Sequence, residues 1–279
     1  MAADEELRAA HQKLQADFSA LCRTKGAKEI DTVASQLSQL KLMLAERELL
    51  YPQPPSPGGF DVDSLVIARD VAEIGALASV HAKDTDSFDR YWSQLKPFYL
   101  DLSTYLPPSD NYEPIVGLSL LRKLSSNSIS AFHMALEMLP AELVRDSPYI
   151  QHPVLLERWL MEGSYSNVWR ERQNVPREEF QFFVDMLMVT IRHEIASCEE
   201  KAYDSLPLND VATLLFFNSL PEVLEFAKER GWNVNPTTQT VEFATKHAER
   251  SAADGAERIP RRATITSNLH FARELESIV

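Results

Sequence analysis

The segment from residue 177 to residue 203 carries apolar side chains that advance by three or four positions at each step. That spacing puts them on one face of an α-helix, which repeats every 3.6 residues. The face consists of Phe180, Val184, Leu187, Ile191, Ile195, Cys198 and Ala202. Phe183, Met186 and Met188 add apolar surface on other faces, and we interpret them as core residues rather than as a binding groove. The pattern predicts one long, central helix.

Helical spacing continues through most of the chain. Apolar stripes in residues 4–22 and 29–50 predict a helical hairpin that needs a partner helix. In residues 63–81, small side chains such as Gly75 allow close packing between helices. We expect Pro97 to kink or split the helix that follows. Further helices are expected at 86–103, 113–124, 128–139, 153–161 and 164–173.

The spacing of apolar residues changes after residue 203. A short apolar helix is expected at 209–217, and Ser219 with Glu222 forms a capping-box pattern for a helix that ends at Gly231. Two short runs of alternating polar and apolar residues then predict a β-hairpin around residues 235–238. Two helices followed by a hairpin are the layout of a winged helix.

Two segments do not fit a helix or a strand. Residues 51–60 are rich in Pro and Gly, and residues 244–263 are charged and small. The predicted fold is therefore mainly α, with helical hairpins, then a winged helix with one small β-hairpin, then a C-terminal helix. The expected parts are a hairpin (1–50), a linker (51–60), helical repeats (61–203), the winged helix (204–243), a tether (244–263) and a terminal helix (264–279).

Charge and motifs exclude several functions. The formal net charge of −13 disfavours nucleic-acid binding. The helix predicted before Gly231 carries three acids against two bases, which argues against a DNA-reading role. We find neither a signal peptide nor an apolar run long enough to span a membrane, so we expect a soluble, intracellular protein.

The sequence carries few motifs that are associated with catalysis or metal binding. His193-Glu194 begins like a zinc-protease helix, but the second His, one turn on, is replaced by Ser197. The two cysteines, Cys22 and Cys198, are expected to be reduced thiols. We therefore predict no catalytic residues, no metal and no cofactor.

Two surfaces are candidates for docking to other proteins. The terminal helix carries an apolar stripe after the tether and is expected to dock on other chains more readily than on its own domain. This stripe and its neighbours are Leu269, Phe271, Ala272, Leu275, Ile278 and Val279. In the hairpin, Trp232, Val234, Val241 and Phe243 are expected to place one face on the local helices. An edge of the hairpin, including the Val241 N–H, is then expected to be free to pair with a neighbouring subunit.

Long blocks of the chain resemble the PCI-domain family. The block ARDVAEIGA begins at Ala68, AKERGW begins at Ala227, and ARELESIV closes the chain. The other blocks are 86–91, 153–157, 160–165, 194–198, 200–203 and 215–218. They run in order over residues 60–279, which is more specific than a short motif.

The resemblance implies a right-handed, TPR-like stack of helical hairpins followed by a winged helix. It also implies a non-catalytic scaffold subunit of the 26S proteasome lid, found in cytoplasm and nucleus, which helps complete the lid and join it to the base. Its implied partners are other PCI-type lid subunits, through the winged helix and the C-terminal helix, and indirectly the base. The alternative is a PCI subunit of the signalosome or of a translation initiation factor complex. A winged-helix nucleic-acid binder and a cryptic hydrolase remain as hypotheses from other classes.

Overall fold

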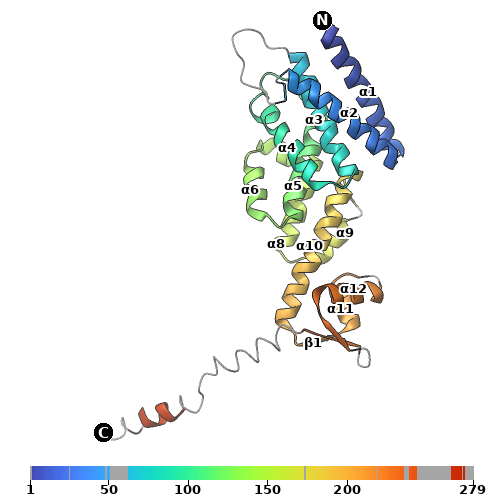
Figure 1. Cartoon of the computed structure of the whole chain (residues 1–279). Helices are drawn as coiled ribbons and strands as arrows, with labels where there is room; N and C mark the ends of the chain where they lie inside the picture. The colour runs from blue at the N-terminus through green and yellow to red at the C-terminus, as the bar shows by residue number, and fades with distance from the viewer. Residues whose placement is uncertain are drawn as a thin grey trace. The chain divides into compact units, whose positions relative to one another are not determined.

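The fold is given by a computed structural model, shown in Figure 1. It describes residues 2–24, 26–47, 49–50, 62–172, 174–217, 219–235, 239–243, 265–271 and 273. The predicted linker 51–60 and tether 244–263 lie outside the described residues, as do Ala272, Leu275, Ile278 and Val279. Two compact units can be distinguished, residues 1–190 and 191–279, and each is described by itself.

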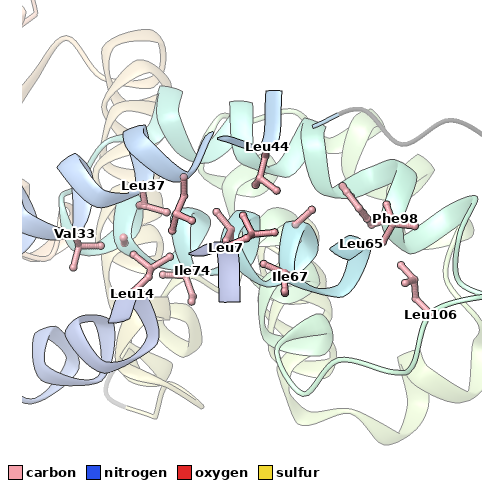
Figure 2. Packing of buried hydrophobic residues seen from close by; sticks show 14 of the residues in the cluster. Leu7, Leu14, Val33, Leu37, Leu44, Leu65, Ile67, Ile74, Phe98 and Leu106 are labelled. Carbon is pink, nitrogen blue, oxygen red and sulfur yellow. The ribbon is translucent and has the colours of Figure 1, made fainter. Parts of the chain in front are cut away.

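The first unit begins with the predicted helical hairpin. Helices α1 (Ala2–Thr24) and α2 (Ala27–Glu46) pack on each other and on α3 (Val62–His81). Figure 2 shows leucines of both hairpin helices meeting apolar side chains of α3. The partner helix that the two stripes require is therefore α3. The most deeply buried hairpin residues are Leu7, Leu14, Leu21, Val33, Leu37, Leu40 and Leu44.

Two glycines allow helices of the first unit to approach closely. A Cβ atom on Gly75 of α3 would lie 2.3 Å from the ring of Tyr91 in α4 (Thr85–Leu100). A Cβ atom on Gly117 of α5 (Tyr112–Ser125) would lie 2.5 Å from the Tyr149 carbonyl oxygen in α8 (Pro148–Met161). The predicted role of Gly75 in close packing is thus confirmed.

Helix α4 begins and ends for identifiable reasons. The Asp84 side chain accepts hydrogen bonds from the backbone N–H groups of Asp86 and Ser87, at 3.1 and 3.2 Å, and so caps the first turn. Pro97 lies in the last turn, where its missing N–H costs one hydrogen bond, and α4 ends at Leu100. The helix is not split at Pro97, and it ends three residues before the predicted limit.

Three further helices of the first unit are short, namely α6 (Ile129–Glu137), α7 (Ala141–Asp146) and α9 (Tyr165–Glu171). The first part of the long helix α10 (Glu178–Ala202) also belongs to this unit. Helix α7 was not predicted, and α8 starts at Pro148 rather than at 153. Proline is well suited to the first position of a helix, where its N–H would have no partner, so Pro148 begins α8 instead of preceding it.

The second unit contains the end of α10 and a winged helix. Its elements are β1 (Ser205–Pro207), α11 (Leu208–Leu214), α12 (Leu220–Arg230), β2 (Asn233–Asn235) and β3 (Thr240–Glu242). Helix α12 ends at Gly231 in the left-handed conformation (φ 73°), as predicted. The strands form an antiparallel sheet in the order β1-β3-β2. The predicted mainly α fold with a winged helix is confirmed, and β1 is a strand that the sequence did not predict.

Candidate docking site in the winged helix

The winged helix is held together by a row of aromatic rings. Phe226 of α12 lies between Phe217 and Trp232, with both ring centroids 5.6 Å away. Trp232 then meets Phe243 edge to face at 5.0 Å. Such arrangements stabilise a core beyond the area that they bury. The row fixes the sheet on the helices of its own unit.

Two side chains tie this core to the end of α10. The Trp232 indole N–H donates to Glu200 Oε1 at 2.7 Å. The Arg230 guanidinium donates to the His193 carbonyl at 2.5 Å and to Ser197 Oγ at 3.2 Å, and lies 3.8 Å from Glu200. Sequence reasoning missed this role of Arg230 and Glu200, because no local motif brings α12 and α10 together.

The backbone hydrogen bonds show which residues of β3 face β1. The Phe243 N–H donates to the Asp204 carbonyl at 3.2 Å, and the Leu208 N–H donates to the Gln239 carbonyl at 2.8 Å. Residues of an antiparallel strand alternate in the side to which their polar groups point. Val241 therefore points its N–H and C=O toward β1. The expectation that the Val241 N–H is free at a sheet edge is wrong, because β3 is the central strand.

The same alternation identifies the polar groups at the outer edges. Asn233 and Asn235 of β2 are in register with Glu242 and Thr240, which point toward β2. Val234 consequently turns its N–H and C=O away from β3. The opposite edge, β1, contains Pro207, which has no N–H to donate. The edge of β2 at Val234 is therefore better suited to pair with another strand.

The predicted interface side chains fall into three groups. Trp232, Val241 and Phe243 are 8%, 0% and 1% exposed, so they pack within the winged helix. Val234 is half-buried on β2. Leu269 and Phe271 lie in a helical stretch, residues 265–271, and are 60% and 64% exposed. The terminal helix thus presents exposed apolar side chains to a partner, whereas the hairpin presents the backbone of an edge strand.

Helix α12 carries two basic residues, but one of them, Arg230, is not available to a ligand on its surface. Arg230 is engaged with α10, which leaves Lys228 beside Glu222, Glu225 and Glu229. The Ser219 hydroxyl donates to Glu222 Oε1 at 2.7 Å, so the predicted capping box does not form its usual bond to the backbone. Little on this helix would attract a phosphate backbone.

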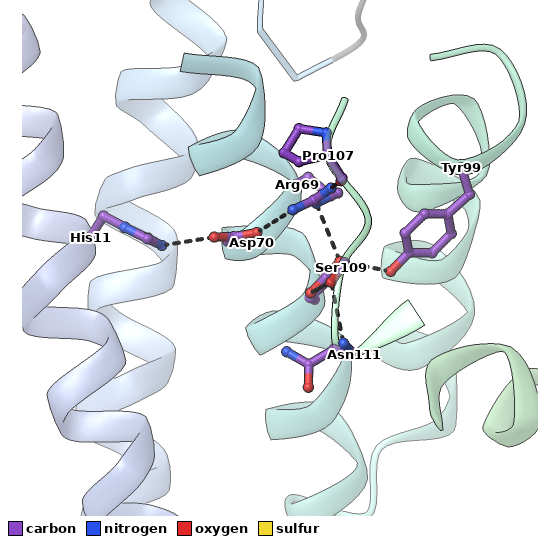
Figure 3. A network of polar contacts seen from close by, with 8 residues as sticks. His11, Arg69, Asp70, Tyr99, Pro107, Ser109 and Asn111 are labelled. Atoms are coloured by element: carbon purple, nitrogen blue, oxygen red, sulfur yellow. Dashed lines mark hydrogen bonds and ion pairs between the residues drawn. The ribbon is translucent and has the colours of Figure 1, made fainter. Parts of the chain in front are cut away.

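Several ionisable groups in the first unit form a network of polar contacts, drawn in Figure 3. Glu73 of α3 accepts from Tyr99 Oη at 2.9 Å and from Ser109 Oγ at 2.8 Å, and Arg69 lies 3.5 Å away. Arg69 also donates to the Pro107 carbonyl. Burial raises the pKa of Glu73, while its hydrogen bonds oppose that rise. These hydrogen bonds hold α3, α4 and the loop after α4 together.

The positions that resembled a metal site have other roles. The His193 ring stacks near Phe226, with centroids 5.2 Å apart, and its carbonyl accepts from Arg230. Among the residues that the structure describes, no group of three or more His, Cys, Asp or Glu side chains could hold a metal ion. None of the described helices is long and apolar enough to cross a bilayer.

Comparison with known proteins decides the family. A sequence model of the CSN8/PSMD8/EIF3K family matches residues 110–252. The chain belongs to the CSN8/PSMD8/EIF3K family. The match runs from the start of α5 through the winged helix, and it confirms the PCI-type resemblance that the sequence blocks indicated.

Relatives from this family match the chain over most of its length. The chain is 38% identical, over 253 residues, to 26S proteasome non-ATPase regulatory subunit 8 homolog A of Arabidopsis thaliana, covering 90% of this chain and 92% of the relative. It is 38% identical to 26S proteasome regulatory subunit RPN12 of Saccharomyces cerevisiae, over 71% of this chain and 74% of that one. The Caenorhabditis elegans 26S proteasome non-ATPase regulatory subunit 8 is 29% identical over 97% of this chain and 99% of its own length.

Proposed function

We propose that this chain is a non-catalytic scaffold subunit of the 26S proteasome lid. The observation that carries the proposal is its match, over nearly the full length, to proteins named as 26S proteasome regulatory subunits. The buried carboxylate of Glu73 is hydrogen-bonded by Tyr99 and Ser109, which supports a structural rather than a catalytic role for that cluster. We further propose that it acts in the cytoplasm and nucleus, where it helps complete the lid and join it to the base.

The proposed docking surfaces are the terminal helix and the edge of β2 that pairs with no other described strand. Backbone groups of Val234 can extend the sheet into a neighbouring subunit, since an edge strand offers unpaired donors and acceptors. Leu269 and Phe271 are exposed large apolar side chains, and these gain stability when a partner covers them. The buried side chains of Trp232, Val241 and Phe243 would keep the sheet rigid during this pairing.

Subunits of the signalosome or of a translation initiation factor are the second candidate, because the matching family model is not restricted to proteasome subunits. The relatives named above favour the proteasome. A nucleic-acid role is disfavoured by the acidic face of α12 and the engaged Arg230.

The test is native mass spectrometry of complexes isolated on a tagged copy of this chain. The proposal expects proteasome lid and base subunits in a defined stoichiometry. Recovery of signalosome or initiation-factor subunits in place of lid subunits would replace it with the second candidate.

A further inference from the structure

A cavity of about 390 Å³ lies on the first unit between α4, α5 and α6. Its walls include the aromatic side chain of Trp92 and the apolar side chains of Leu100, Met134 and Met138. Leu100, Met134 and Met138 are 51%, 68% and 65% exposed. An exposed group of large apolar side chains around a hollow is typical of a binding surface. Methionine adapts its shape to different ligands, which suits such a surface.

Two lysines add positive charge to this groove. Lys96 is exposed and Lys123 is half-buried, and both line the cavity. Among the described residues, no carboxylate forms an ion pair with either of them. The charge of Asp89 raises the pKa of Lys123, but Asp89 is already paired with Arg122 at 3.0 Å.

The groups around Lys123 leave its charge poorly compensated. Burial lowers the pKa of Lys123, and repulsion from Lys96 lowers it further. Among the described residues, its ammonium group donates to the Ser119 carbonyl, at 3.4 Å, and lies over the ring of Trp92, 5.8 Å from the centroid. The Trp92 indole N–H is buried and has no acceptor in the part of the chain that the structure describes. An anion bound beside Lys123 would therefore supply the charge compensation that the described residues do not provide.

We propose that the groove between α4, α5 and α6 binds a short segment of a partner protein that presents apolar side chains beside a carboxylate. The apolar side chains would enter between Trp92 and the two methionines. The carboxylate would lie between Lys96 and Lys123 and compensate two like charges at once.

The charges favour a protein segment over other anionic partners. A lipid surface is usually recognised by four to eight basic residues, and a nucleic acid by a basic stripe. This groove offers two lysines on a chain whose formal net charge is −13. A single acidic side chain on an apolar segment matches both the small number of charges and the apolar walls.

The experiment uses the full chain and a set of labelled, amidated helical peptides of about 14 residues. Each peptide carries two leucines, at positions i and i+4, and a single glutamate. The glutamate occupies a different remaining position in each peptide of the set. In a matched set, lysine replaces the glutamate. Binding is measured by fluorescence anisotropy. At least one glutamate peptide should bind about tenfold more tightly than its lysine counterpart, and this preference should weaken with added salt.

Charge reversal gives the sharpest comparison. Lys96→Glu combined with Lys123→Glu should reverse the preference, so that the lysine peptide binds better. Lys13→Glu, an exposed lysine on α1, is the control and should change nothing. Met138→Asp should abolish binding, whereas Met161→Asp, at a site with nearly the same exposure (64%), should not.

Three results would overturn the proposal. The first is that no glutamate peptide binds. The second is binding that Met138→Asp and Met161→Asp weaken equally, because that would place the site elsewhere. The third is that vesicles of anionic phospholipid bind through the two lysines while the peptides do not, which would make the groove a membrane-contact surface. The winged-helix proposal would be unaffected by any of these results.

Discussion

The indole N–H of Trp232 donates to Glu200 Oε1 at 2.7 Å, which fixes the start of β2 to the end of α10. Trp232 also contacts Phe226 and Phe243, so this bond positions a ring inside the aromatic row. The free edge at Val234 begins two residues later. The orientation of that edge therefore depends on a hydrogen bond between two residues, Trp232 and Glu200, that lie far apart in the sequence.

Glu200→Ala should destabilise the second unit by about 1–3 kcal/mol, because it leaves the indole N–H without its acceptor. It also removes a carboxylate near Arg230. Chemical denaturation followed by tryptophan fluorescence measures the loss. Lys201→Ala, at the exposed neighbouring position, is the control and should change stability by less than about 0.5 kcal/mol. Equal stability of the two variants would show that the hydrogen bond has no structural role.

Gly75→Ala should destabilise the first unit, although alanine is the better helix former by about 1 kcal/mol. The new methyl group would overlap the Tyr91 ring, and overpacking of this kind typically costs about 1–3 kcal/mol. Tyr91→Leu should recover part of the loss in the double variant. The same Tyr91→Leu change should not rescue Gly117→Ala, whose conflict is with the Tyr149 carbonyl. Thermal unfolding of the three single and two double variants tests this, and simple additivity for Gly75 and Tyr91 would contradict it.

The burial of Glu199 should make the free energy of unfolding depend on pH. It is 4% exposed, and its two carboxyl oxygens have no hydrogen-bond partner among the described residues. Burial, with a contribution from Glu200, raises its pKa from 4.5 to about 7. The unfolded chain then loses this proton at lower pH than the folded chain, so the free energy of unfolding falls as pH rises from about 4.5 to about 7.

Glu199→Gln should remove that part of the pH dependence. Its stability should equal that of the unchanged protein near pH 4 and exceed it at pH 8. The shift corresponds to a gain on the order of 3 kcal/mol, at 1.36 kcal/mol per pKa unit. Thermal unfolding at a series of pH values gives the difference curve. A difference that does not change with pH would mean that the carboxyl group is solvated in solution.

Val234→Pro should weaken assembly without unfolding the protein, because the lost N–H points away from β3. Val241→Pro, in the central strand, should instead destabilise the sheet itself. Ser205→Pro at the β1 edge is the matched control and should assemble normally. Circular dichroism checks folding, and co-purification with lid subunits measures assembly. If Ser205→Pro is the variant that fails to assemble, the contact lies on the β1 edge.

Long helices were predictable because their apolar stripes are continuous. Helix α10 was expected at 177–203 and runs from Glu178 to Ala202. Helix α7 has six residues, too few for a periodic pattern to stand out, and none of them is buried. Strand β1 has one apolar residue, Leu206, and exists because it pairs with β3 across a distance in sequence that no local pattern reveals.

The docking surface was predictable in part. Alternating residues identified the hairpin, but not which strand is central, since that depends on β1. The groove of Trp92, Lys96 and Lys123 could not be found from spacing, because its walls come from three separate helices. Of these three residues, Trp92 and Lys96 lie on α4, whereas Lys123 lies on α5.

The terminal helix provides the most direct test of the proposed function. The chain truncated after Pro260, and the full chain with Phe271→Asp and Leu275→Asp, are each mixed with lid subunits and isolated through them. We predict that both variants keep the unfolding temperature of the unchanged protein but fail to co-purify with the lid, because two charges cannot be buried unpaired in an apolar interface. Normal assembly of either variant would contradict a docking role for this helix, and a large loss of thermal stability would show that the helix belongs to the core of its own chain.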